Sequence, residues 1–301
     1  MRRIDALKQR MKKGLFFLWM SRGRLGWLNF PILCRLPGGG LILAYGDHMG
    51  SRFFLQAYLG RPYEDGCQKL IRRLLKPGMT FFDIGANQGF YTMIGARQVG
   101  QSGLVVAFEP VPSVMRKLRR NIDLNGYHHV KAEQFAVSRI EGSVDMHVCR
   151  EGFESLSSLR EPAEDVLVKQ EILRVSLIPL DDYVEKVRIG RIDLVKIDVE
   201  GGELDVLAGG SRLWEHGRPV VLCEIEDKRT NKWHYRASRI IEFLEGYGYR
   251  WFEVGTDGTL RIKEPTEEHI LFSNYVAVPE ERISSVSGLI SPSRETRGEG
   301  P

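Results

Sequence analysis

The stretch TFFDIGANQGFYT, residues 80–92, passes from a short apolar run through two spaced glycines into a segment of helical character. The run TFFDI is typical of a buried strand, and residues 90–99 predict a helix. Glycine between a strand and a helix lets the backbone turn tightly and approach a ligand closely. We therefore expect a ligand-binding turn at residues 83–89.

This strand and helix begin a regular alternation that continues to about residue 280. Further strands are predicted at 103–110, 130–137, 142–149, 191–201, 219–226, 249–255 and 271–278, and further helices at 112–124, 203–216 and 236–247. Strands separated by single helices predict right-handed βαβ units, hence a mostly parallel, doubly wound sheet. The last strands follow each other without an intervening helix, which predicts an antiparallel edge. The expected fold class is α/β, with ligands outside the carboxyl ends of the strands.

The charge of the chain is concentrated at its start. The net charge is +4, but the first 24 residues carry +7 and the remainder −3. The body is therefore not expected to bind nucleic acid. Apolar residues recur at helical spacing in this basic segment, at Ile4, Leu7, Met11, Leu15 and Leu18. They fit a helix resting on the protein's own core, or an amphipathic helix in peripheral contact with an anionic membrane.

The rest of the composition is that of an ordinary soluble protein. The apolar run GLFFLWM is too short to span a bilayer and is followed by arginines, which argues against a secretory signal. Four scattered cysteines predict reduced thiols, and with them a cytoplasmic location. The expected organisation is a basic arm with an accessory segment at 1–59, the α/β domain at 60–280 and a disordered tail at 281–301.

Three ligands compete for the glycine turn. A triphosphate loop needs Lys-Ser or Lys-Thr after its last glycine, and neither follows Gly89. A dinucleotide site favours GxGxxG, whereas this chain has Gly85 and Gly89 with Asp83 ahead of them. A carboxylate there repels a pyrophosphate but suits an ammonium group. The pattern therefore favours S-adenosylmethionine as the cofactor.

Glu109 adds a second sign of a nucleoside. It ends the next predicted strand, 24 residues after Gly85, where a carboxylate accepts hydrogen bonds from ribose hydroxyls. An NAD-type oxidoreductase predicts the same residue and stays an alternative, although Asp83 favours the methyl donor. A nucleic-acid methyltransferase is a further alternative. The −3 charge of the body argues against it, as does KIDVEG standing where an NPPY-type base-flipping motif would be expected.

Five ordered motifs resemble the FkbM family of S-adenosylmethionine-dependent methyltransferases. They are LLKPGMTFFDIGANQGFYT, VVAFEPVPSVMRKLRRNIDLN, SLSSL, IDLVKIDVEGGELDVLAGG and VVLCEIE. The resemblance covers about residues 60–280 and implies a Rossmann-like methyltransferase fold with methyl transfer to an oxygen of a sugar or natural product. By position it implies a cofactor site made of Asp83, Gly85, Ala86, Asn87, Gly89, Glu109, Pro110 and Ala136. Asp83 to Gly89 would hold the methionine end, Glu109 the ribose and the loop at Ala136 the adenine.

The adenine end departs from the pattern of many relatives, which carry an acid soon after the position of Ser138. This chain has Arg139 there, so a backbone group or Gln134 is expected to meet the adenine amino group.

The base for the reaction is expected at the strand ends. Asp198 is the first candidate for base or acceptor anchor, Glu200 the second, and Glu224 a third; alternation in a strand puts Lys196, Asp198 and Glu200 on one face. A lysine in a covered sheet also predicts an ion pair for Lys196 with one of these carboxylates.

An acceptor lid is expected from the segment after residue 226. It would use Asn231 and Trp233, with His234 as a reserve base. Lys196 and Glu226, on the predicted strands, are further candidates for acceptor binding in the same cleft. The acceptor is expected to be a small molecule or a saccharide. Converging carboxylates can bind Mg²⁺, but no spacing here demands a metal, so none is expected. These patterns indicate no oligomeric state.

Overall fold

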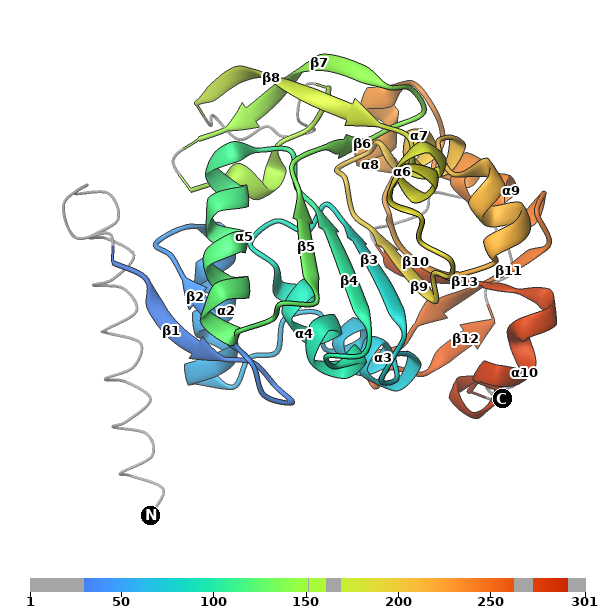
Figure 1. Ribbon diagram of the computed structural model, residues 1–301, viewed down its shortest axis with the longest axis horizontal. Coiled ribbons are helices and arrows are strands. Elements are labelled where there is room, and N and C mark those ends of the chain that lie inside the picture. Colours follow the sequence, from blue (N-terminus) through green and yellow to red (C-terminus); the bar gives the residue numbers. More distant parts are fainter. Residues whose placement is uncertain (1–29, 151, 161–168, 263–272, 292–301) are drawn as a thin grey trace, which may run out of the picture.

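The computed structural model describes residues 30–150, 152–160, 169–262 and 273–291. The predicted basic helix of the first 24 residues lies outside these ranges. An eight-stranded central sheet has the order β12-β11-β13-β10-β9-β3-β4-β5 (Figure 1). Its strands are β3 (Thr80–Ile84), β4 (Leu104–Phe108), β5 (Val130–Glu133), β9 (Leu194–Ile197), β10 (Val220–Ile225), β11 (Tyr249–Val254), β12 (Leu260–Ile262) and β13 (Ser273–Pro279).

The direction of these strands confirms the predicted fold class. Strands β5, β4, β3, β9 and β10 pair in parallel, and β13, β11 and β12 add an antiparallel edge. The chain builds outward from β3 through β4 to β5, then returns to place β9 on the other side of β3. The strand order therefore reverses between β3 and β9, which is where an open α/β sheet binds its ligand.

Alternation of side chains along the strands divides the core between the two faces of the sheet. Phe81 packs into one apolar cluster and its neighbour Phe82 into another. Residues of α2 (His48–Leu59), α3 (Asp65–Leu74), α4 (Phe90–Val99) and α5 (Pro112–Asn125) join the first cluster. Residues of α6 (Leu180–Val187), α7 (Glu203–Ala208) and α9 (Ser238–Glu245) join the second. Both faces are thus covered by helices, as the parallel pattern requires.

A smaller sheet lies over the carboxyl ends of the central strands (Figure 1). It has the order β6-β8-β7, formed by β6 (Ala136–Val137), β7 (Gly142–Cys149) and β8 (Gln170–Ile178). The strand expected at 142–149 is confirmed, and it pairs with β8 in antiparallel fashion. The single strand predicted at 130–137 is wrong. The chain leaves the central sheet after Glu133, and Ala136 pairs instead with Leu177 of β8.

Two other predicted elements are shorter than expected. Strand β9 ends at Ile197 rather than 201. The helix predicted at 203–216 is interrupted: α7 ends at Ala208, and a π-helical turn η2 (Leu213–Gly217) follows the Gly209–Gly210 pair. The remaining short helices are η1 (Glu154–Leu156), α8 (Asp227–Thr230) and η3 (Asn231–Trp233).

Both ends of the described chain are more structured than the sequence predicts. The hairpin of β1 (Ile32–Arg35) and β2 (Leu41–Ala44) and helix α2 contribute to the first apolar cluster, so residues 30–59 share the core of the α/β domain. The tail predicted as disordered from 281 is wrong as far as residue 291. There the chain forms η4 (Glu280–Arg282), α10 (Ile283–Val286) and η5 (Ser287–Leu289), and Ile290 forms a bridge with Leu260.

Candidate active site

The glycine turn after β3 is shaped by its neighbour β9. Gly85 has φ +79°, and a Cβ built on it would stand 1.9 Å from the carbonyl oxygen of Asp198. Only glycine allows the two strand ends to come this close. Gly89, with φ +90°, then leads into α4. The predicted turn therefore lies at the reversal of strand order.

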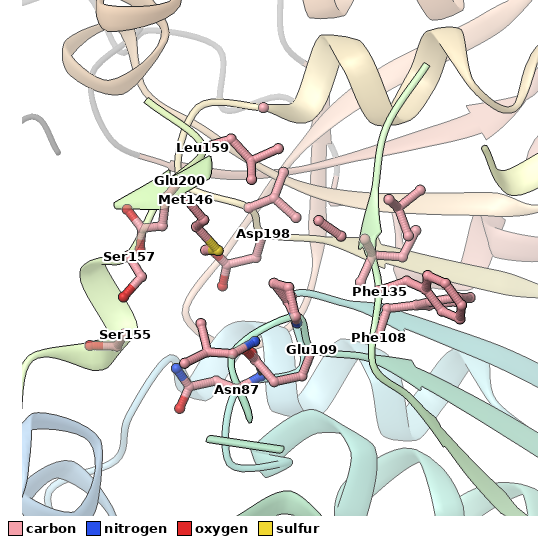
Figure 2. A pocket seen from close by; sticks show the side chains of 18 of the residues that line it. Asn87, Phe108, Glu109, Phe135, Met146, Ser155, Ser157, Leu159, Asp198 and Glu200 are labelled. Carbon is pink, nitrogen blue, oxygen red and sulfur yellow. Dashed lines mark hydrogen bonds between the residues drawn. The ribbon is translucent and has the colours of Figure 1, made fainter. Parts of the chain in front are cut away.

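A first pocket of about 650 Å³ opens beside this turn (Figure 2). Six of the residues expected to bind ligand line it: Gly85, Asn87, Glu109, Pro110, Ala136 and Trp233. Figure 2 shows Phe108 and Phe135 at one end and Ser155 at the other, with Glu109 and Asp198 between them. The pocket is thus apolar at one end and polar at the other.

Glu109 is held rigidly at the middle of the first pocket. Its Oε1 accepts a 2.8 Å hydrogen bond from the backbone N–H of Val111, and Oε2 accepts a 3.1 Å bond from that of Asn87. Burial raises the pKa of Glu109 to about 7, against these two bonds. Each oxygen still has a lone pair that is free to accept a further hydrogen bond.

Three other expected cofactor residues lie behind the turn rather than on the pocket wall. Asp83, Ala86 and Gly89 do not line the cavity formed by the described residues. Asp83 is buried, and its Oδ2 accepts a 2.6 Å hydrogen bond from Thr92 Oγ1. Burial raises the pKa of Asp83, with Lys196 opposing the shift. Its carboxyl group therefore acts on the site only from beneath the turn.

A second pocket of about 910 Å³ adjoins the first. The two share Gly85, Asn87, Ser155, Asp198 and Glu200. The second pocket is the more polar, with titratable side chains from several parts of the chain: His48, Arg52, Tyr63, Glu64, Glu224 and Arg229. Asp198 and Glu200 thus stand where two cavities of different character meet.

Asp198 is the centre of a charged network. Lys196 is buried, and its Nζ lies 2.9 Å from Asp198 Oδ2, which confirms the predicted ion pair. Burial alone would raise the pKa of Asp198, but Lys196, a hydrogen bond with Glu224 and the charge of Arg229 together hold it well below its usual range. Burial and the Asp198 charge raise the pKa of Glu224 well above its usual range. Within this pair Glu224 therefore holds a proton more tightly than Asp198, and Arg229 Nη1 lies 3.6 Å from Glu224 Oε2.

Glu200 reaches the site by a route that strand alternation did not predict. Because β9 ends at Ile197 and Glu200 has φ +59°, the prediction that it shares a strand face with Lys196 is wrong. Its carboxylate forms an ion pair with Arg229. Arg229 also pairs with Glu226 at 2.7 Å, so Glu226 supports the site without lining either pocket.

Only part of the segment expected to form a lid lines a pocket. Trp233 packs over Gly201 and Gly202 and lines the first pocket, with the guanidinium of Arg160 5.6 Å from its ring centroid. Asn231 and His234 are exposed and line neither cavity defined by the described residues.

The residues expected to meet the adenine are placed differently from one another. Gln134 is exposed and does not line the cavity between the described residues. Arg139 forms an ion pair with Asp205, and Asp205 lines the first pocket. A carboxylate is therefore present at this pocket, supplied by α7.

Helix α2 contributes residues to the site that no sequence motif indicated. Asp47 caps this helix, with Oδ1 accepting a 2.7 Å bond from Gly50 N, and His48 follows it into the second pocket. His48 Nδ1 lies 3.0 Å from Oγ of Ser155, a residue of the SLSSL motif. An Asp directly before a segment whose apolar residues recur at helical spacing is a known signal for the start of a helix. This signal would have predicted the cap at Asp47.

Two structural features are absent from the described residues. Within residues 30–150, 152–160, 169–262 and 273–291, no helix is both long and apolar enough to cross a membrane. Over the same ranges, no three His, Cys, Asp or Glu side chains gather in an arrangement that could hold a metal ion.

Comparison with known proteins gives the family. The model of the methyltransferase FkbM domain matches residues 83–251. The chain is 29% identical to the 31-O-demethyl-FK506 methyltransferase FkbM of Streptomyces tacrolimicus over 71% of this chain and 87% of that protein. It is 28% identical to Methyltransferase 1 of Beauveria bassiana over 42% of its own length, and spans 56% of that relative.

A solved structure, methyltransferase FkbM from Methylobacillus flagellatus, superposes with a TM-score of 0.41 at 14% identity, covering 76% of this chain and 53% of that one. Since the family model matches more than half of the chain, this protein belongs to the methyltransferase FkbM family.

Proposed function

We propose that this protein transfers a methyl group from S-adenosylmethionine to a hydroxyl oxygen of a saccharide or natural-product small molecule. The observation that carries the proposal is the junction of two unlike pockets at Gly85, Asn87, Asp198 and Glu200. A group transfer needs its two reactants to meet at one point, with each held in its own cavity.

The first pocket fits the donor. Glu109 has acceptor capacity left for two ribose hydroxyls, and Phe108 and Phe135 offer an apolar end for a purine ring. The methionine end would then lie along the glycine turn, with the carboxyl group of Asp83 behind it. When bound, the donor supplies an activated methyl group on a sulfonium.

The second pocket fits an uncharged, hydroxyl-rich acceptor. Its carboxylates Glu64, Asp198 and Glu200 face the cations Arg52 and Arg229, so donors and acceptors of hydrogen bonds are mixed and opposite charges offset each other. The name of the relative from Streptomyces tacrolimicus, a 31-O-demethyl-FK506 methyltransferase, also supports oxygen as the receiving atom.

The residues at the junction orient the acceptor. Asp198 stays ionised because Lys196 and Glu224 stabilise its charge, so it accepts a hydrogen bond from the acceptor hydroxyl and aims the oxygen at the methyl group. Alignment of this kind contributes up to about 7–11 kcal/mol in well-ordered intramolecular reactions. Glu200, fixed by Arg229, is a second anchor on the same wall.

A labelled-donor assay tests the proposal. The wild-type protein is incubated with [methyl-¹³C]S-adenosylmethionine and a panel of methyl glycosides, polyols and fractionated host metabolites, and products are read by mass spectrometry. We expect O-methylated product with the wild type and none with Glu109→Gln, which loses the ribose contact. Binding of NAD with no binding of S-adenosylhomocysteine in calorimetry would instead favour the oxidoreductase alternative.

A further inference from the structure

The second pocket contains a histidine that comes from outside the family domain. His48 is the first residue of α2, whereas the family match begins at residue 83. It is the one imidazole among the described residues that line this pocket. Its ring stacks on Phe153, with centroids 6.0 Å apart and planes 21° apart. It is thus a half-buried, ordered ring beside the proposed acceptor.

The contacts of His48 favour one tautomer. Arg52 Nη2 lies 3.3 Å from Nε2, and because a guanidinium only donates, this contact is a hydrogen bond in the tautomer that leaves Nε2 unprotonated. Nδ1 then carries the proton and donates to Ser155 Oγ at 3.0 Å. The lone pair of Nε2 is held only by a long contact with the exposed Arg52, so a hydroxyl in the pocket can replace it.

Two further contacts fix the ring relative to the glycine turn. The backbone N–H of His48 donates to Gly152 O at 2.8 Å. The preceding Asp47 accepts a 2.8 Å bond from Gln88 Nε2, a side chain of the turn itself. The start of α2 is therefore fastened both to the turn and to the segment that carries Ser155.

The carboxyl groups of the second pocket are poor proton acceptors by comparison. Asp198 is stabilised in its charged form by Lys196, and Glu224 shares a hydrogen bond with Asp198 and lies 3.6 Å from Arg229 Nη1. Glu200 is engaged by Arg229, and Glu64 accepts a hydrogen bond from the hydroxyl of Tyr91. A group that must take a proton needs an available lone pair, and among the pocket's described residues the Nε2 of His48 offers one.

We propose that His48 is the general base, whose Nε2 takes the proton of the acceptor hydroxyl while Asp198 orients that hydroxyl. This inference rests on the proposed O-methyl transfer. As the oxygen forms its bond to the methyl carbon, the carbon–sulfur bond breaks and its electron pair goes to sulfur. The hydroxyl proton moves to Nε2, leaving an imidazolium that returns the proton to solvent.

The electrostatic surroundings keep this imidazole neutral. Burial lowers the pKa of His48, Arg52 lowers it further and Asp47 opposes them. The other titratable or charged groups on the same pocket are Tyr63, Glu64, Asp198, Glu200, Glu224 and Arg229. The methylation rate is therefore expected to rise with pH through a value below 6.5 and to stay level above it.

A spectroscopic test needs no acceptor. The protein is labelled with ¹⁵N-histidine, S-adenosylhomocysteine is added, and long-range ¹H–¹⁵N spectra are recorded from pH 5 to 8, with His48→Gln assigning the signals. We expect a neutral ring protonated on Nδ1 at pH 7. A charged ring at pH 7, or a proton on Nε2, would overturn the proposal.

The kinetic test uses the acceptor panel of the labelled-donor assay. His48→Gln keeps the size and a hydrogen bond to Ser155, so we expect an unchanged Kd for S-adenosylhomocysteine and a kcat lower by about 10²–10⁴-fold. Added imidazole should partly restore His48→Ala. His216→Gln, with 73% of the side chain exposed, is the matched control and should keep full activity. A His48→Gln enzyme retaining a third of the wild-type rate would overturn the proposal.

The two proposals fail differently. If the wild type methylates no member of the panel, the proposed function fails. The ¹⁵N spectra still show whether the His48 ring is neutral and protonated on Nδ1, as a general base at this position requires. If the wild type is active and His48→Gln equally so, only the role of His48 fails.

Discussion

Gln88 Nε2 donates a 2.8 Å hydrogen bond to Asp47 Oδ2, and this bond joins the start of α2 to the glycine turn after β3. Lys117 Nζ, on α5, lies 2.7 Å from the same oxygen. Asp47 and Gln88 are both buried, so water competes little for these contacts. Asp47 lies 36 residues before the start of the family match, and it thus helps to hold the glycine turn, which the proposed donor would contact.

Asp47→Ala should therefore destabilise the whole domain. The substitution removes the cap of α2 and leaves Gln88 and Lys117 without their shared partner, which we expect to lower the free energy of unfolding by about 3 kcal/mol. Urea denaturation measures this. Asp145→Ala, which breaks an exposed ion pair with Arg174, is the control and should cost less than about 1 kcal/mol. Equal losses in the two variants would contradict the buried role of Asp47.

Gly85→Ala tests the close approach of β3 and β9. Both Gly85 and Gly126 have positive φ, but a Cβ at Gly85 would meet Asp198 O at 1.9 Å, whereas at Gly126 it would meet nothing within 4 Å. Gly126 is in the left-handed helical region, so we expect Gly126→Ala to cost about 1 kcal/mol from backbone strain alone, and Gly85→Ala about 3 kcal/mol or more. Thermal unfolding with calorimetry of S-adenosylhomocysteine binding checks both. A Gly85→Ala protein as stable as Gly126→Ala would show that the turn can relax.

Local patterns predicted the part of the site that is local in sequence. The glycine turn and Glu109 follow strand ends, and their spacing depends only on one βαβ unit, so both were found. The ion pair of Lys196 was predictable because a lysine in a covered sheet needs a partner. These are short-range consequences of chain geometry.

Contacts between distant segments were not predictable in the same way. Ala136 and Val137 continue the apolar run of β5, and only their pairing with Leu177 and Ile178 shows that they belong to another sheet. His48 is a single histidine with no motif, and its role depends on packing against Ser155, 107 residues away. Such relationships exist only once the tertiary structure has formed.

Glu109 predicts a pH dependence of donor binding. Burial raises its pKa from 4.5 to about 7. Between these two pH values the folded protein keeps a proton on Glu109 that the unfolded chain has lost, so the free energy of unfolding falls as pH rises from 4.5 to 7. The pKa of Glu203 is likewise raised to about 7, and acts in the same direction. Ribose hydroxyls donate best to the ionised form of Glu109, so donor affinity should rise with pH as Glu109 ionises around its folded-state pKa of about 7.

Calorimetry of S-adenosylhomocysteine between pH 6 and 8 measures this effect. We expect the Kd to tighten about tenfold in the wild type, as the fraction of ionised Glu109 increases. Glu109→Gln should bind weakly and equally at both pH values, which separates Glu109 from Glu203. A wild-type Kd that does not change with pH would contradict ribose binding by an ionised Glu109.

Asp205 predicts how the adenine amino group is recognised when no acid follows Ser138. Its carboxylate lines the first pocket and is held by Arg139, so we expect it to accept a hydrogen bond from the adenine N6. Asp205→Asn should then weaken S-adenosylhomocysteine binding by about tenfold, in line with a charge-assisted hydrogen bond of about 1.5–3 kcal/mol. S-inosylhomocysteine, which has an oxygen in place of that amino group, should bind the wild type poorly and lose no more affinity in Asp205→Asn. Equal weakening of both ligands would mean that Asp205 supports the pocket wall and does not contact the base.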